Sequence, residues 1–151
     1  MITYKEGDIF TTDMPAIGHG VNCKGVMGSG IAVTVRKLYP DVYKAYAQYC
    51  RTPGLNGGDV FIMKSEVDGK YIFNMASQVK MGKNATYDLL EASLWAAFDG
   101  LEELELSGLA LPQIGCGIGG LEWAKARPMI EEVAASYPLI DVELWTFNPR
   151  K

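Results

Sequence analysis

The 151-residue sequence has few of the residues that hold metals or disulfide frameworks. It contains one histidine, His19, and three cysteines, Cys23, Cys50 and Cys116, without CxxC spacing. An odd number of cysteines at such spacings argues against a disulfide framework, and one histidine adds too few ligands for a zinc site. We therefore expect a reducing, cytoplasmic setting, with no metal and no other cofactor.

Long apolar runs and clusters of basic residues are also lacking. No apolar run is long enough to span a membrane, and the start MITYKEGDIF has no apolar region behind a basic cluster, so we expect no membrane span and no signal peptide. The net charge is −4 and the pI is near 5.0, which argues against a nucleic-acid-binding face. Backbone N–H groups would then have to hold any anionic ligand.

Length and composition favour one domain over residues 1–151. With 48% hydrophobic residues spread along the chain, the protein can bury a core without metals or disulfides. No internal repeat or low-complexity tract suggests a second unit. A monomer is the default expectation.

The apolar patterns alternate between strand and helix. Strands are expected at residues 2–7 (an edge strand), 16–22, 58–65, 70–76, 109–114 and 141–147, with 58–65 and 70–76 paired through EVDG in the middle of the sheet. Helices are expected from Ser29 to Pro40, from Val42 to Cys50, from a Thr86 cap to Gly108 with a stripe of Leu90, Leu94, Ala97, Phe98, Leu101 and Leu104, and through Trp123, Arg127, Ile130 and Val133. This order predicts an α/β fold with helices on both faces of a mixed sheet.

Two glycine-rich loops, GVMGSG at 25–30 and GCGIGG at 115–120, follow expected strands. Neither is a Walker A motif or a GxGxxG fingerprint. A tight strand-to-helix turn would explain the first loop alone, but four glycines in six residues exceed what a turn requires and favour close approach to a diphosphate. Because ligands of open α/β sheets lie beyond the carboxyl ends of the strands, we expect both loops to meet at one cleft.

Four further residues are candidates beside these loops. His19 is either a core residue bonded to a carbonyl or, at the floor of the cleft, an acid, base or hydrogen-bond donor. Asp8 either opens a turn or accepts an amino hydrogen from adenine. Phe147 and Asn148 are either core and turn residues or neighbours of a base. The remaining Met and Trp residues are expected in the core.

The motifs GDIF, VNCKGVMGSGIA and LPQIGCGIGGLEW together resemble the macrodomain family of ADP-ribose-binding modules, and the resemblance covers nearly the whole chain. It implies a three-layer α/β/α fold with a central mixed sheet and ADP-ribose across its top. The sequence is most similar to the branch that holds the terminal ADP-ribose protein glycohydrolase, antitoxins that remove ADP-ribose from DNA, and yeast-type ADP-ribose-1''-phosphate phosphatases.

The resemblance also implies a position for each ligand contact. Asp8 and Ile9 would contact the adenine, which Phe147 or Asn148 would border, and Asn22 would face the distal ribose. The first loop would wrap the phosphates and distal ribose with Met27, Gly28, Ser29, Gly30 and Ile31. The second would close over the diphosphate with Gln113, Ile114, Gly115, Cys116, Gly117, Ile118 and Gly119.

Departures from the family pattern bear on the chemistry. The glycohydrolase uses a lysine after the middle strand and an aspartate in the second loop, and the matching residues here are Gln78 and Gly119, with Lys80 offset by two positions. A covalent ribosyl-lysine route would therefore lack its nucleophile and its acid–base partner.

The HGVN motif is similar to that of the phosphatase-like members. This implies hydrolysis of ADP-ribose-1''-phosphate to ADP-ribose and phosphate, in which His19 protonates the leaving oxygen or orients water and Asn22 positions the distal ribose. Two alternatives stay open: a non-catalytic reader of ADP-ribose, and an ADP-ribosyl hydrolase that removes ADP-ribose from macromolecules by substrate-assisted water attack.

Overall fold

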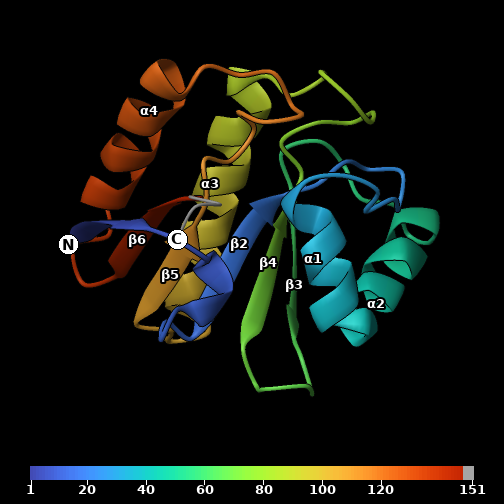
Figure 1. The fold of residues 1–151 in the computed structure, drawn as a ribbon, viewed down its shortest axis with the longest axis horizontal. Helices are drawn as coiled ribbons and strands as arrows, with labels where there is room; N and C mark the ends of the chain where they lie inside the picture. The colour runs from blue at the N-terminus through green and yellow to red at the C-terminus, as the bar shows by residue number, and fades with distance from the viewer. Residues whose placement is uncertain (148–151) are drawn as a thin grey trace.

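The computed structural model describes residues 1–147, which form one six-stranded sheet between two pairs of helices (Figure 1). The strands are β1 (Ile2–Glu6), β2 (Ala16–Gly20), β3 (Val60–Lys64), β4 (Tyr71–Met75), β5 (Gly108–Leu111) and β6 (Asp141–Thr146). Their order in the sheet is β1-β6-β5-β2-β4-β3. All neighbours are parallel except the β3–β4 hairpin, which makes the sheet mixed, as expected.

The helices cover both faces of the sheet. One side carries α1 (Ile31–Leu38) and α2 (Pro40–Arg51), and the other carries α3 (Tyr87–Glu103) and α4 (Trp123–Ala135). Each side has its own buried cluster, one including Val35 and Tyr46 and the other including Phe98 and Ile130. The three-layer α/β/α arrangement is thereby confirmed, with the helix pairs on either side of the sheet in Figure 1.

Local sequence signals account for most helix boundaries. Pro40 begins α2, where its missing N–H costs nothing. The Thr86 side chain caps α3 by accepting a hydrogen bond from the Leu89 N–H at 3.1 Å. The α3 stripe is buried from Leu90 to Leu101, as its spacing predicts.

Two expectations about the elements were wrong. The third helix ends at Glu103 rather than Gly108, which begins β5, and Leu104 is 40% exposed. Glu105 adopts φ +56, and the Leu106 N–H returns to the Leu101 carbonyl at 2.9 Å, a helix-ending turn usually made by glycine.

The other correction concerns β3, whereas the helix predicted through Trp123 and Val133 is confirmed as α4. The β3 strand lies at the sheet edge rather than in its middle, because β4 pairs with β2 on one side and with β3 on the other. On α4, the position facing the core is Ala126, and Arg127 is exposed. Within residues 1–147, no helix is both long and apolar enough to cross a membrane.

Candidate functional site

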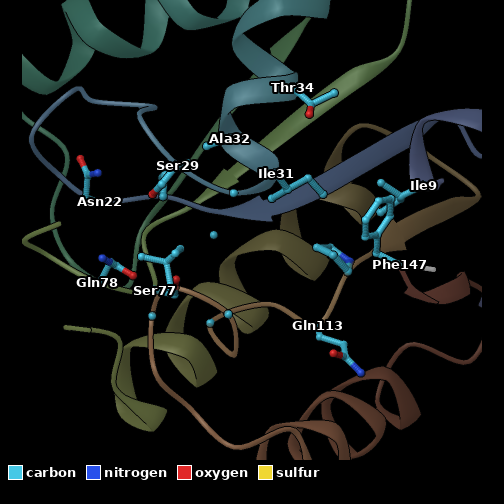
Figure 2. A pocket seen from close by; sticks show the side chains of 18 of the residues that line it. Ile9, Asn22, Ser29, Ile31, Ala32, Thr34, Ser77, Gln78, Gln113 and Phe147 are labelled. Atoms are coloured by element: carbon cyan, nitrogen blue, oxygen red, sulfur yellow. The ribbon is translucent and has the colours of Figure 1, made fainter. Parts of the chain in front are cut away.

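A pocket of about 900 Å³ lies beyond the carboxyl ends of the parallel strands. Its walls come from the segments that follow β1, β2, β4 and β5 and from the end of β6, and both glycine-rich loops contribute. The expected convergence of the two loops is therefore confirmed. Figure 2 shows an elongated site, with Ile9 and Phe147 at one end and Asn22, Ser77 and Gln78 at the other. The volume lies in the upper range for small-molecule pockets.

Most residues that the sequence singles out line this pocket. They are Asp8, Ile9, Asn22, Gly28, Ser29, Gly30, Ile31, Gln113, Gly115, Gly117, Ile118, Gly119 and Phe147. Four others, His19, Met27, Ile114 and Cys116, are not among the lining residues. Met27 and Ile114 are buried, and each belongs to the hydrophobic cluster on its own side of the sheet. Asn148 lies outside the described residues.

His19 lies in the core and not at the cleft floor, which corrects the expected placement. Strand residues alternate between faces, and the face of β2 that carries His19 is the one covered by α1 and α2. Its Nε2 donates to Asn74 Oδ1 at 2.7 Å, while the Asn74 Nδ2 donates to the Phe61 carbonyl at 2.9 Å. The imidazole is fully buried and leaves Nδ1 without a partner among the described residues.

The protonation state of His19 also differs from that of an acid catalyst. Burial lowers its pKa to about 4, although the hydrogen bond to Asn74 acts in the opposite direction. The ring is therefore neutral near pH 7 and does not reach a ligand in the pocket. As placed here, it cannot protonate a leaving group on such a ligand.

Asn22 lines the pocket, but its side chain is engaged within the protein. The Nδ2 group donates to the Val26 carbonyl at 2.9 Å, and Oδ1 accepts from the Lys24 N–H at 2.9 Å and from the Tyr46 hydroxyl at 3.0 Å. These bonds hold the loop from 22 to 26 in shape. Asn22 is therefore a positioning residue for the first glycine-rich loop.

The first loop presents backbone donors to the pocket. Gly30 caps α1 with φ +61, a conformation that favours glycine, and Ile31 and Ala32 in the first helical turn line the pocket. The first N–H groups of a helix have no partners within it and carry partial positive charge. This end of α1 can therefore bind an anion without a basic side chain.

The second loop is closed largely by its own backbone. The Gly115 carbonyl accepts from the Leu121 N–H at 2.9 Å, and the Gln113 carbonyl accepts from the Cys116 N–H at 3.1 Å. A Cβ on Gly119 would lie 2.6 Å from the Gly115 oxygen, so the fold itself requires that glycine. The fold makes no such demand at Gly117, where a Cβ would meet nothing within 4 Å.

Gln78 occupies the far end of the pocket, where a lysine nucleophile would be needed for the glycohydrolase route. Its Nε2 donates to the carbonyls of Lys80 at 2.6 Å and Gly82 at 2.9 Å, which fixes the loop after β4. The side chain of Lys80 is exposed and does not line the pocket. Gly119 lines the pocket at the position of the aspartate, so neither the lysine nor the aspartate of that route is present among the described lining residues.

Among residues 1–147, only one ionisable side chain, that of Asp8, lines the pocket. Its Oδ1 accepts from the Phe10 N–H at 3.0 Å. Nearby, Ile9 and Trp145 are buried, whereas Phe147 is 72% exposed. The Cys116 thiol does not line the pocket, and burial raises its pKa, so it is no activated nucleophile.

Sequence reasoning missed several lining residues, among them Gly20, Thr34, Ser77 and Trp145. A signal for one of them exists in the strand pattern. Residues directly after each predicted parallel strand belong to the ligand edge of the sheet, and this rule points to Ser77. Gly20 lies inside the predicted strand 16–22, because β2 ends two residues earlier than expected. The apolar pattern predicts a core role for Trp145, and the residue is buried. It also borders the pocket, which the pattern does not indicate.

Comparison with known proteins gives a consistent result. The family model described as "Macro domain" matches residues 18–130. The "DNA ADP-ribosyl glycohydrolase" of Mycobacterium tuberculosis is 32% identical over 99% of this chain and 42% of its own length. The human "ADP-ribose glycohydrolase OARD1" is 33% identical over 87% of this chain and 83% of its own. The "ADP-ribose 1''-phosphate phosphatase" of Candida albicans is 29% identical over 87% of this chain and 93% of its own.

Solved structures agree with these matches. The macrodomain of Mycobacterium tuberculosis DarG superposes with a TM-score of 0.91 at 30% identity, over 96% of this chain and 97% of that one. Thermosipho africanus DarTG in complex with ADP-ribose superposes with a TM-score of 0.87 at 25% identity, over 99% of this chain and 42% of that one.

Proposed function

Since the chain belongs to the macrodomain family, we propose that its pocket binds ADP-ribose and that it hydrolyses ADP-ribose-1''-phosphate to ADP-ribose and phosphate. Relatives in this family include ADP-ribosyl glycohydrolases and a phosphatase, which supports a hydrolase. One observation carries the finer choice of reaction: Asp8, next to Ile9 at the end opposite Gln78, is the single ionisable side chain that lines the pocket among the described residues.

The binding mode follows from the shape of the pocket. Asp8 offers a carboxylate to an amino group, and Ile9 and Phe147 offer apolar surface to adenine. The diphosphate would lie between the α1 N-terminus and the second loop, where backbone N–H groups replace basic side chains. The distal ribose would then lie near Asn22 and Gln78, at the end of the pocket shown in Figure 2.

No ionisable side chain of the described residues lines the distal end of the pocket, which suits a leaving group that carries its own proton. The second pKa of a phosphate monoester is about 6, so the monoanion is available near neutral pH and leaves from C1'' as HPO4²⁻. In the proposed step the C1''–O bond breaks, and the ring oxygen supports positive charge at C1''. Water then adds to C1'' and releases its proton to the departing phosphate or to solvent. Backbone N–H groups stabilise the negative charge of the phosphate.

A second candidate is removal of ADP-ribose from a macromolecule. The matched glycohydrolases favour it, although this chain spans 42% of the mycobacterial relative. Residues 22–31 and 77–87, which flank the distal end, contain three exposed lysines and no acidic residue in a chain of net charge −4. Such a rim, made of Lys24, Lys80 and Lys83, suits a polyanionic carrier such as DNA.

Product analysis separates these functions. Purified protein is incubated with ADP-ribose-1''-phosphate, with ADP-ribosylated DNA and with ADP-ribosylated protein, while ADP-ribose affinity is measured in parallel. The proposal expects phosphate release from the first substrate, and in ¹⁸O-water it expects unlabelled phosphate because the C1''–O bond breaks. Free ADP-ribose from DNA or protein alone would favour the second candidate. ADP-ribose binding without any product would identify a reader.

A further inference from the structure

The hydroxyl of Ser77 is a buried polar group with no hydrogen-bond partner within residues 1–147. Ser77 is 1% exposed, yet it lines the distal end of the pocket, as Figure 2 shows. Its backbone is held on both sides, because its N–H donates to the Met75 carbonyl at 2.8 Å and its carbonyl accepts from the Thr86 N–H at 3.3 Å. A buried hydroxyl without a partner is costly, so a ligand oxygen or water has reason to bind it.

Gly20 keeps this hydroxyl open toward the pocket. A Cβ on Gly20 would lie 2.7 Å from Ser77 Oγ and 3.2 Å from Ile114 Cγ1. The backbone of Gly20 does not require glycine, because the residue ends β2 in regular pairing with Met75 and has no positive φ. The absence of a side chain at Gly20 therefore leaves open space beside the Ser77 hydroxyl at the end of β2.

A second donor borders the same space. The Gly115 nitrogen lies 3.7 Å from the point where a Gly20 Cβ would be, and its N–H has no acceptor within the described part of the chain. Gly20, Ser77 and Gly115 all line the pocket. Two unused donors thus lie beside one small opening. The single described lining carboxylate is that of Asp8, the residue before Ile9, and Ile9 lies at the opposite end of the pocket in Figure 2.

We propose that Ser77 O–H and Gly115 N–H form a subsite for one oxygen of the terminal phosphate of the substrate. This inference rests on the proposed function and adds the residue that distinguishes ADP-ribose-1''-phosphate from ADP-ribose. The Gly115 N–H can only donate and the Ser77 hydroxyl can donate as well, so the pair can give two hydrogen bonds to one oxygen. This arrangement suits an anionic phosphate oxygen, because hydrogen bonds to a charged acceptor are the stronger ones. Gly20 leaves the room that this oxygen needs.

The test compares the affinities of ADP-ribose-1''-phosphate and ADP-ribose in wild type, Ser77→Ala and Gly20→Ala. ADP-ribose is measured by calorimetry, and the phosphorylated ligand by brief competition against labelled ADP-ribose at low temperature, so that turnover does not interfere. Ser93→Ala is the matched control, because Ser93 is equally buried, bonds the Leu90 carbonyl at 2.8 Å and does not line the pocket.

Ser77→Ala should weaken ADP-ribose-1''-phosphate about ten- to a hundredfold, the usual loss for a hydrogen bond to a charged group, and change ADP-ribose less than about threefold. Gly20→Ala should shift the ratio in the same direction, and Ser93→Ala should leave it unchanged. Equal weakening of both ligands by Ser77→Ala, or no change in either, would overturn the subsite. Absence of phosphate release by wild type would count against the proposed function and leave this affinity ratio as a separate result.

Discussion

The two faces of β2 end in different environments. On the face toward α1 and α2, His19 is fully buried and bonded to Asn74. On the opposite face, Gly20 carries no side chain and opens onto the pocket beside Ser77. One residue thus serves the core and the next serves the site. Position near a ligand loop does not assign a role to a side chain, because strand alternation decides which face it joins.

This difference predicts that substitutions in the core change the free energy of unfolding, whereas substitutions in the pocket change ADP-ribose affinity. The largest effect is expected for His19→Ala, which should lower the free energy of unfolding by about 3 kcal/mol, since it leaves a cavity and an unpaired Asn74 oxygen. ADP-ribose affinity should change less than about threefold at a temperature where the variant is folded. Denaturant unfolding and calorimetry measure the two quantities, and a large loss of affinity with unchanged stability would break the comparison.

The same histidine should make stability depend on pH. Its pKa is about 4 in the folded protein, against 6.5 for a histidine exposed to water, so the unfolded chain binds more protons between these values. This contribution to stability is complete above pH 6.5 and is lost as pH falls toward 4, by up to about 3 kcal/mol. The difference in unfolding free energy between wild type and His19→Gln should be constant above pH 6.5 and should change as pH falls toward 4. A difference that stays constant over this range would contradict this origin.

Two glycines of the second loop, Gly119 and Gly117, should differ in how their substitution affects stability and ADP-ribose affinity. Gly119→Ala forces a Cβ against the Gly115 oxygen at 2.6 Å. It should lower the free energy of unfolding by about 2 kcal/mol and also weaken ADP-ribose binding. Gly117→Ala should change stability by less than about 0.5 kcal/mol, because its Cβ meets nothing within 4 Å. It should still weaken ADP-ribose several-fold, since Gly117 lines the pocket. Unchanged affinity in Gly117→Ala would show that no ligand approaches this backbone closely.

The smallest effect is expected at the exposed end of the pocket. Phe147→Ala should leave stability within about 0.5 kcal/mol, because the ring is 72% exposed. ADP-ribose affinity should fall about three- to tenfold through lost contact with the base. Leu139→Ala is a control, because Leu139 is 93% exposed and does not line the pocket. Equal affinities in the two variants would remove Phe147 from the adenine end.

Much of the fold could be predicted because its signals are local. Helical spacing indicated all four helices, the Thr86 cap gave the start of α3, and apolar segments of strand length indicated all six strands. The end of α3 could not be predicted, because Glu105 adopts a left-handed conformation that glycine usually takes.

The site was predicted less completely than the fold. The glycine-rich loops and the strand-end rule located the pocket. His19 was misplaced because residues on both faces of β2 are buried, so its apolar pattern does not reveal which face meets the ligand. The strand-end rule indicates the position of Ser77 but not that its hydroxyl is unpartnered. One of the hydrogen bonds that occupy the Asn22 side chain comes from Tyr46, 24 residues away in the chain.

The most direct test of the account is the pH profile of phosphate release from ADP-ribose-1''-phosphate by wild type and His19→Gln, each measured where it is folded and binds ADP-ribose normally. The account predicts that both release phosphate and that their profiles coincide, because His19 does not touch the substrate and the pocket reacts without a side-chain acid. Loss of turnover in His19→Gln, with ADP-ribose affinity intact, would contradict it and return the histidine to the reaction.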